Sequence, residues 1–313
     1  MRSSSFPQPY EGSSVYHYTD AAGLLGILEN HCLRATEVTG MNDPREINFG
    51  IAQLQKDNIP SDLSSFVEEY RDGGELSFIN DVFATCGSKT GDDVSQWARY
   101  TPWPEAGYCV ELDPGVPLYV VRHDKPVRSK DGRTNWSALL DIANVLKWTE
   151  VSYGEKHFVS MLRELKDWAD NITKTEPVVV EDTGIVSDPR HHTISSALAS
   201  VTRLAKHESF ESEQEVRIVT TLLAPGNYVK YRASRYGVVR YLELAAGKRS
   251  DYGDFVVRDQ GGPPSGERLP IKSITVGPAP YAQNGVRTIE QLLKSNGYTE
   301  PNVEVRLSEA QVR

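Results

Sequence analysis

The segment E-S-F-E-S-E-Q-E-V-R-I-V-T-T-L, residues Glu208 to Leu222, contains the pattern that decides the fold of this chain. From Gln214 onward it alternates as a β-strand does, with successive side chains on opposite faces. The apolar face carries Val216, Ile218 and Leu222, and the charged face carries Glu213, Glu215 and Arg217. One face therefore belongs to the core, and the opposite face holds two carboxylates and a guanidinium.

The charged face has two interpretations. Charged groups on a buried strand are costly to desolvate unless they pair or meet a ligand, which makes this face a candidate wall of an active cleft. The alternative is an edge strand whose charged side is solvated or forms cross-strand ion pairs, and on this segment alone it is slightly favoured. The choice depends on the rest of the chain.

Size and composition are those of an ordinary soluble globular protein. The 313 residues, 39% hydrophobic and 25% charged, can bury the core of one large domain or of two. The net charge of -9 argues against a protein held on nucleic acid by bulk electrostatics. Cys32, Cys86 and Cys109 lack the spacing of a zinc site or a disulfide framework. We expect a cytoplasmic location, because no segment has the apolar length of a signal peptide or a membrane span.

The order of the expected elements predicts an α+β fold. Residues 1–14 are predicted to be a flexible lead, and residues 15–313 a single catalytic-type domain with an inserted helical and loop region near 155–206. Strands are expected at Val15–Thr19, Asp81–Ser88, Gly107–Leu112, Gln214–Val219, Val238–Leu244, Ile271–Gly277 and Val303–Ser308. Helices are expected after Asp20 and Asp93 and at Glu155–Asn171, His192–Lys206 and Val286–Ser295, with a long loop at Lys174–Pro189. This order favours a mixed, mostly antiparallel split sheet with flanking helices.

The sequence lacks the motifs of several common enzyme classes. It has no G-x-G-x-x-G after a strand, no Walker-type phosphate loop, no H-E-x-x-H and no G-x-S-x-G. A Rossmann oxidoreductase, a P-loop ATPase, a zincin and an α/β-hydrolase are therefore not expected. The histidines fall in no ligand pattern, so no metal site is predicted.

A set of polar residues spread along the chain is the best candidate for a site. Its members are His17 and Thr19 on the first strand, Asn42 and Asp43 in a turn, Ser88 at the end of a strand, Tyr100 on a helix, and Glu213 with Glu215. Each has an ordinary interpretation as well: a satisfied core histidine, turn residues, a core aromatic. Their order along the chain is harder to attribute to chance.

That order resembles the ADP-ribosyltransferase fold, which carries a His or Arg on its first strand, a Ser, Thr or Tyr element in the middle and a catalytic Glu late in the chain. More closely, the chain resembles the DUF2971 family of mostly bacterial proteins, and the likeness runs almost end to end. The matching segments are Tyr16–Thr19, Asn42–Pro44 with Glu46, Ser88, Ser95–Tyr100, Gly107–Tyr108, Glu213–Arg217, Gly277–Pro278 and Ser308–Arg313. Where the family usually shows Ser-Phe-Ser, this chain has Thr85-Cys-Gly-Ser88, which leaves only one hydroxyl in the later position.

The resemblance implies an enzyme that consumes NAD by cleaving its nicotinamide-ribose bond. Glu215 would be the catalytic carboxylate that stabilises an oxocarbenium-like centre, and Glu213 would orient or deprotonate the acceptor. His17 and Thr19 would hold the ribose and the carboxamide, and Tyr100 would stack on the leaving ring. The remaining NAD-binding candidates are Asn42 and Asp43 on the cleft rim, Ser88, and Arg217, which would either neutralise the two acids or reach the pyrophosphate.

The implied partners are NAD and a macromolecular acceptor, protein or nucleic acid, or water in its place, as in a toxin or a phage-defence effector. Two other classes remain open: a non-catalytic sensor or interaction module on the same fold, and an RNA-directed enzyme with the same His and Glu set. We expect Val15–Thr19 and Gln214–Val219 to lie on neighbouring strands, with His17 and Glu215 facing a shared cleft. A purely catalytic Glu215 predicts that Glu215→Gln keeps its stability, whereas a structural ion pair predicts that it loses stability.

Overall fold

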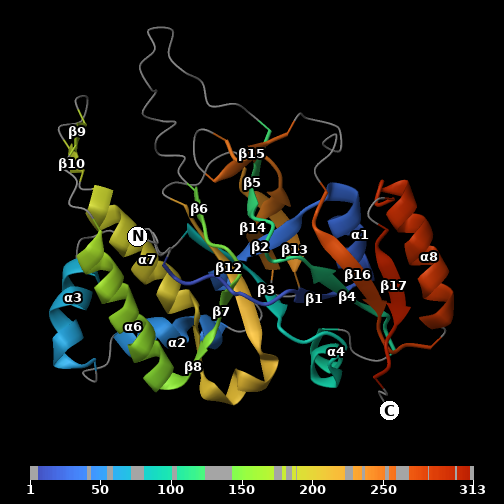
Figure 1. The fold of residues 1–313 in the computed structure, drawn as a ribbon, viewed down its shortest axis with the longest axis horizontal. Helices are drawn as coiled ribbons and strands as arrows, with labels where there is room; N and C mark the ends of the chain where they lie inside the picture. The colour runs from blue at the N-terminus through green and yellow to red at the C-terminus, as the bar shows by residue number, and fades with distance from the viewer. Residues whose placement is uncertain are drawn as a thin grey trace, which may run out of the picture.

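A computed structural model gives the architecture of most of the chain. The described residues are 6–40, 44–54, 59–71, 81–100, 104–123, 143–172, 178–180, 185–187, 189–222, 228–234, 237–250, 254–258, 268–280, 282–299 and 302–310. Their strands gather in a mixed sheet, and their helices flank it (Figure 1). The predicted α+β class is confirmed.

Thirteen strands of the described residues form the main sheet. They are β1 (Val15–Asp20), β2 (Leu33–Glu37), β3 (Val82–Ser88), β4 (Gly107–Leu112), β5 (Leu118–Arg122), β6 (Ala143–Val145), β7 (Thr149–Glu150), β12 (Glu215–Leu222), β13 (Lys230–Ser234), β14 (Gly237–Ala246), β15 (Phe255–Val257), β16 (Ile271–Val276) and β17 (Glu304–Leu307). The main path runs β15-β5-β14-β2-β3-β1-β4-β16-β17. Within it, β15 pairs with β5 and β17 with β16 in parallel, and the other pairs are antiparallel.

The sheet divides at β3. One edge of β3 pairs with β12, beginning with Glu215 opposite Ser88. The other edge is shared, because β1 pairs there through Tyr16 opposite Ser88, and β2 pairs further along with Thr36 opposite Ala84. One branch continues from β1 through β4, β16 and β17, and the other from β2 through β14 and β5. The sheet is therefore split at the strand that carries Ser88.

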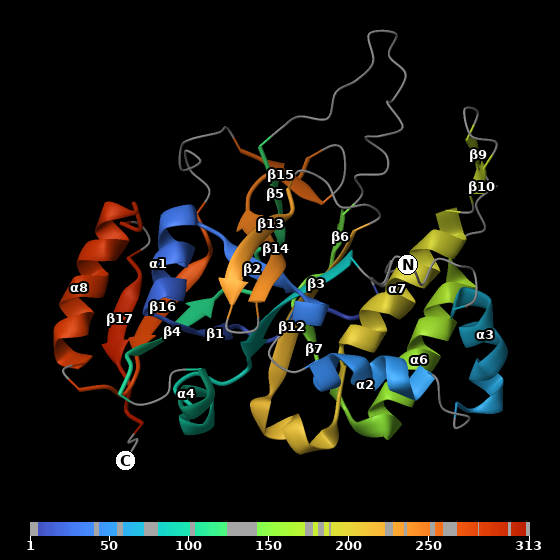
Figure 2. The same ribbon diagram turned by 180° about the vertical axis from the view of Figure 1, so that it is seen from behind.

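Most of the helices form two groups on the flanks of this sheet, and the helix at Val94–Tyr100 lies apart from both groups, against β1 (Figures 1 and 2). They are α1 (Ala21–Asn30), α2 (Pro44–Leu54), α3 (Ser61–Arg71), α4 (Val94–Tyr100), α6 (Gly154–Asn171), α7 (Pro189–Arg203) and α8 (Ala282–Ser295), with short 3-10 turns η1 (Val38–Gly40) and η3 (Glu208–Glu213). At one end α2, α3, α6 and α7 pack on one another, and at the opposite end α1 and α8 lie near β16 and β17.

Hydrophobic periodicity explains how helices of both groups pack. Leu24 and Leu28 of α1 recur four residues apart, as one helix face requires, and pack into the main core with side chains from the sheet. In α6 the apolar positions Phe158, Leu162 and Leu165 form a similar stripe, which is buried against α3 and α7. Burying one such large apolar side chain contributes about 1.5–3 kcal/mol.

The region around 155–206 contains more structure than the sequence predicts. The predicted helices are present as α6 and α7, but the loop expected at 174–189 holds a hairpin, β9 (Val178–Val180) with β10 (Ile185–Ser187). The predicted helix to Lys206 ends at Arg203. The chain then forms β11 (Ala205–Lys206), parallel to β8 (Ser152–Tyr153).

Strand β12 differs from the sequence expectation in two ways. It is not an edge strand, because it pairs with β3 on one side and with β6 and β7 on the other. Glu213 is not on the strand but ends η3, and Gln214 follows with a left-handed φ of 44° before β12 starts at Glu215. The interpretation as a solvated edge was therefore wrong, and the side chains of Glu213, Glu215 and Arg217 are buried.

The leading segment, expected to be flexible, makes defined contacts where it is described. The Tyr10 amide donates a hydrogen bond to the Trp148 carbonyl oxygen at 2.7 Å, and the rings of Phe6 and Trp168 lie 5.5 Å apart. None of the helices in the described residues combines the length and the apolarity needed to cross a membrane.

Candidate functional site

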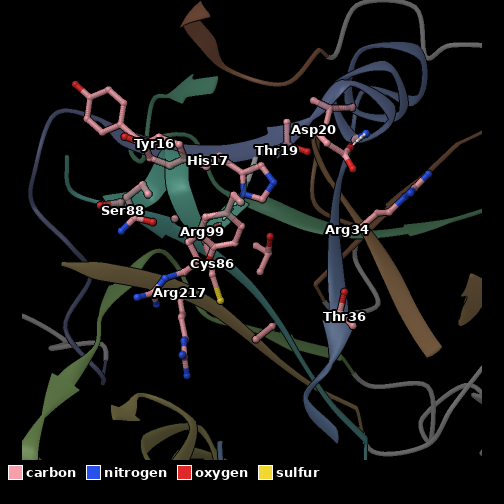
Figure 3. Close-up of a pocket in the computed structure, with 18 of the residues that line it drawn as sticks. Tyr16, His17, Thr19, Asp20, Arg34, Thr36, Cys86, Ser88, Arg99 and Arg217 are labelled. Atoms are coloured by element: carbon pink, nitrogen blue, oxygen red, sulfur yellow. Dashed lines mark hydrogen bonds between the residues drawn. The ribbon is translucent and has the colours of Figure 1, made fainter. Parts of the chain in front are cut away.

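A cavity of about 650 Å³ opens where the β1 and β2 branches separate from β3 (Figure 3). Its lining comes from β1, α1, β2, β3, α4, β12 and β13, together with Lys206 and Glu213. Cavities of a few hundred to a thousand cubic ångströms are typical of small-molecule sites. The cavity therefore has the size and the concave shape of a ligand pocket.

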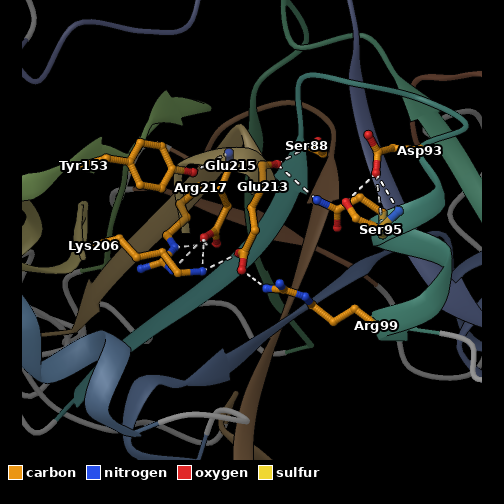
Figure 4. Close-up of polar contacts among 10 residues, drawn as sticks. Ser88, Asp93, Ser95, Arg99, Tyr153, Lys206, Glu213, Glu215 and Arg217 are labelled. Atoms are coloured by element: carbon orange, nitrogen blue, oxygen red, sulfur yellow. Dashed lines mark hydrogen bonds and ion pairs between the residues drawn. The ribbon is translucent and has the colours of Figure 1, made fainter. Parts of the chain in front are cut away.

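One end of the cavity holds a compact cluster of charged side chains, Lys206, Glu213, Glu215 and Arg217 (Figure 4). Arg217 donates from Nε to Glu215 Oε1 at 2.6 Å and from Nη2 to Oε2 at 2.8 Å. The Lys206 ammonium donates to Glu215 Oε2 at 3.1 Å and also pairs with Glu213. Arg99 reaches the same Glu213 carboxylate from α4. With Arg99 included, the cluster joins two carboxylates to three cations.

The charged groups of this cluster are buried, which strengthens their electrostatic interactions. Glu215 and Arg217 are 6% and 2% exposed, and Lys206 is 2% exposed. Burial alone would raise the pKa of Glu215, but Arg217 and Lys206 outweigh it and bring that pKa to about 2. Glu215 is therefore a carboxylate throughout the neutral range.

The turn at Gln214 brings Glu213 into the cluster although it is not on the strand. The Glu213 carbonyl oxygen accepts hydrogen bonds from Ser88 Oγ at 2.9 Å and from Gln96 Nε2 at 3.1 Å. With its backbone held in this way, the Glu213 side chain reaches Lys206. Ser88 lines the cavity, but its hydroxyl is used to position this turn.

His17 faces the cavity with a fixed tautomer. Its Nδ1 lies 2.8 Å from the Cys86 carbonyl oxygen, which can only accept, so Nδ1 carries the proton. Burial lowers the pKa of His17 and keeps the ring neutral. The Nε2 atom is then free to accept a hydrogen bond from a ligand in the cavity. Thr19, two positions further along β1, also lines the cavity.

Aromatic side chains form the wall near α4. The Tyr18 ring stacks with the Tyr100 ring at 6.4 Å and meets the Trp97 ring edge-on at 4.8 Å. The Tyr18 hydroxyl accepts from the Asp93 amide at 2.9 Å and donates to the Thr90 carbonyl oxygen, which fixes the start of α4 against β1. Tyr100, 39% exposed, is left at the mouth of the cavity.

The cavity brings together most of the residues predicted from the sequence. Those that line it are His17, Thr19, Ser88, Tyr100, Glu213, Glu215 and Arg217. Asn42 and Asp43 lie outside the described residues. The expectation that the His17 and Glu215 strands are neighbours was wrong, because β3 lies between β1 and β12. The two residues nevertheless line the same cavity.

Several cavity residues were missed by the sequence reasoning. Arg99 stands three positions after Gln96, so helical spacing alone would have placed it on the same face of α4 as Gln96. Lys206 sits in no pattern, since its two-residue strand forms only by pairing with β8. Among the residues that the structure describes, no group of three His, Cys, Asp or Glu side chains is arranged to hold a metal ion.

Comparison with known proteins gave no match, whether to family models, to curated proteins or to solved structures. Membership of the DUF2971 family and likeness to the ADP-ribosyltransferase fold therefore stay predictions from the sequence. The residues of the cavity are therefore the basis for inferring what the protein does.

Proposed function

We propose that this protein binds NAD in the cavity, cleaves the nicotinamide-ribose bond and transfers ADP-ribose to a macromolecule or to water. The observation that carries the proposal is that residues predicted from separate parts of the sequence meet in one cavity. Residues chosen from the order of polar positions in the chain, from His17 to Arg217, line one cavity although they come from four separate segments. The division of the sheet at β3 also supports an ADP-ribosyltransferase-like fold of the DUF2971 kind.

Glu215 supplies the electrostatic part of this reaction. When the bond between ribose C1′ and the nicotinamide nitrogen breaks, its electron pair leaves with the neutral nicotinamide and C1′ develops oxocarbenium character. A carboxylate that is ionised at neutral pH and held in a buried site stabilises that charge without reorganising. An oxygen of water or of the acceptor then bonds to C1′, and its proton passes to solvent or to Glu213.

The neighbouring residues fit the two parts of the substrate that flank the reacting bond. The neutral His17 offers Nε2 as an acceptor for a ribose hydroxyl, and Thr19 adds a hydroxyl on the same strand. Tyr100 presents a ring at the mouth of the cavity, where a planar leaving group can stack on it. Such contacts align the reacting bond with Glu215.

The sequence left two roles open for Arg217, to neutralise the acids or to reach the pyrophosphate, and its contacts favour the first. Its guanidinium holds Glu215 through two hydrogen bonds and donates a third to the Arg203 carbonyl oxygen at 2.7 Å. It therefore neutralises the acid and does not extend toward a pyrophosphate.

A second function is favoured by the same ion pairs. Both Glu215 oxygens already accept hydrogen bonds from cations, so the cluster is complete without a ligand. On this alternative the cavity binds a nucleotide without cleaving it, and the protein is a sensor or interaction module. The two functions differ in products and not in fold.

The test is to incubate the purified protein with NAD and to separate nicotinamide, ADP-ribose and remaining NAD by chromatography. The proposal predicts free nicotinamide in proportion to protein concentration, together with ADP-ribose or ADP-ribosylated material. Binding of ADP-ribose by calorimetry without any release of nicotinamide would instead support the non-catalytic module. NAD that stays intact in the presence of a protein with no affinity for ADP-ribose would contradict both.

A further inference from the structure

The end of the cavity away from Glu215 carries two arginines that pair with no acid of the described residues. Arg34 extends from β2 toward the Asp20 end of β1 (Figure 3), and Arg232 comes from β13. Both strands pair with β14, so one sheet branch holds the two side chains at a common wall. Within the described part of the chain, neither guanidinium has a carboxylate within 4.0 Å.

The contacts of these two arginines hold them in place without neutralising them. Arg232 donates from Nη2 to Thr36 Oγ1 at 3.1 Å, while its buried Nε has no hydrogen-bond partner among the residues that the structure describes. The Arg34 guanidinium lies over the Tyr241 ring, 5.3 Å from its centre. A buried N–H donor without a partner is costly, and an anion in the cavity would remove that cost.

Other cations already use the carboxylates of this branch. Glu243, opposite Arg34 in the sheet, pairs with Lys230 at 2.7 Å. Glu37, next to Thr36, pairs with Arg240. Glu243 and Glu37 are therefore engaged, and the charges of Arg34 and Arg232 face the cavity, where Asp20 is the lining carboxylate of the same end.

The whole cavity has an excess of positive charge in an otherwise acidic protein. Its lining contains five cationic side chains, Arg34, Arg99, Lys206, Arg217 and Arg232, against three carboxylates, Asp20, Glu213 and Glu215. At the Glu215 end, Lys206, Arg99 and Arg217 all pair with Glu213 or Glu215. At the other end Asp20 also lines the cavity, but within the described residues neither Arg34 nor Arg232 forms an ion pair. The two arginines without ion pairs therefore attract the negatively charged part of a ligand to the Arg34 end.

We propose that Arg34 and Arg232 bind the diphosphate of a nucleotide ligand. Guanidinium groups present paired donors that match phosphate oxygens, and the unpartnered Arg232 Nε supplies one of them. The inference deepens the proposed function, on which it relies for the identity of the nucleotide as NAD. It also orients the substrate: the diphosphate lies at the β2 wall, and the nicotinamide end points toward Glu215.

Gly26 of α1 makes room for this arrangement. A Cβ atom built at Gly26 would lie 3.0 Å from Arg34 Nη2, closer than side chains normally approach. The first turn of α1, with its N-terminal backbone dipole, lines the same end of the cavity through Gly23 and Asp20. The helix and the two arginines therefore face the same volume.

The test measures binding of ADP, inorganic pyrophosphate and adenosine by isothermal titration calorimetry. Wild-type protein is compared with Arg34→Gln, Arg232→Gln and a control, Arg249→Gln, which removes an exposed arginine outside the cavity. We expect each cavity variant to weaken ADP and pyrophosphate binding about tenfold or more, and Arg249→Gln to leave it unchanged. Adenosine, which has no phosphate, should bind all four proteins alike.

The experiment separates this inference from the proposed function, since it requires no NAD cleavage. ADP binding that depends on Arg34 and Arg232 supports the diphosphate site even in a protein that releases no nicotinamide. Arg34 is exposed, so Arg34→Gln keeps the test decisive should Arg232→Gln fail to fold. Equal ADP affinity in wild type and Arg34→Gln, or no binding of ADP and pyrophosphate by wild type, would overturn the inference.

Discussion

Replacement of Glu215 by Gln should destabilise the protein at neutral pH. The change keeps the shape of the side chain but removes the negative charge that Arg217 and Lys206 face at 2.6–3.1 Å. The pKa of Glu215, about 2 against an ordinary 4.5, corresponds to about 3 kcal/mol of stabilisation above pH 4.5. Breaking a buried ion pair by removing one partner typically costs 3–5 kcal/mol, which agrees with this figure.

The pH dependence distinguishes this cause from a general loss of packing. Because folding lowers the pKa of Glu215, its contribution is present above the unfolded pKa and is lost as pH falls from about 4.5 toward 2. Urea unfolding of wild type and Glu215→Gln should therefore differ by about 3 kcal/mol at pH 7 and converge toward pH 2. Glu164→Gln, an exposed change on α6, is the matched control and should stay within about 0.5 kcal/mol of wild type. A Glu215→Gln variant as stable as wild type at pH 7 would refute the ion-pair reasoning.

Three further predictions test the parts that position the site. Gly50→Ala should lower the free energy of unfolding in urea by about 1–3 kcal/mol, because the added Cβ would overlap the Thr202 carbonyl oxygen. A variant as stable as wild type would show that α2 and α7 are not in contact there. Asp20→Ala should cost about 1 kcal/mol through loss of the 2.6 Å cap on the Gly23 amide, and Asp20→Asn should recover most of it. An NMR titration should show that His17 stays neutral, with its proton on Nδ1, at pH values below the usual histidine pKa of about 6.5, because burial disfavours the charged ring. A titration midpoint at the usual histidine pKa would contradict the buried environment of His17.

The local periodicity of the sequence predicted individual strands and helices. Val216 and Ile218 are buried in the main core as the alternation of their strand requires, and the stripe of α6 predicted that helix within one residue of its start. The order of strands was not predictable in this way. Pairing between distant segments places β3 between β1 and β12, and no local pattern encodes that choice.

In the candidate site, too, the residues that stand out in a local pattern were predicted, and the residue brought in by tertiary structure was not. His17 and Glu215 were found because their residue types stand out in strand patterns, whereas Lys206 pairs with Glu215 only after a helix and a turn bring it back. Ser88 illustrates a different limit: its position in the cavity was foreseen, but its hydroxyl is used on the Glu213 carbonyl oxygen. Sequence position indicates proximity to a site better than it indicates what a polar group binds.

The rate of nicotinamide release from NAD by wild type and by Glu215→Gln tests the central claim most directly. It should be measured at a temperature where circular dichroism shows the variant folded, with Lys206→Met as a variant that disturbs the same cluster but keeps the carboxylate. We expect Glu215→Gln to be about a hundred- to a thousandfold slower than wild type, the usual loss for one preorganised electrostatic contact, and Lys206→Met to retain more activity than Glu215→Gln. A folded Glu215→Gln variant that releases nicotinamide at the wild-type rate would contradict the assignment of Glu215 as the catalytic carboxylate.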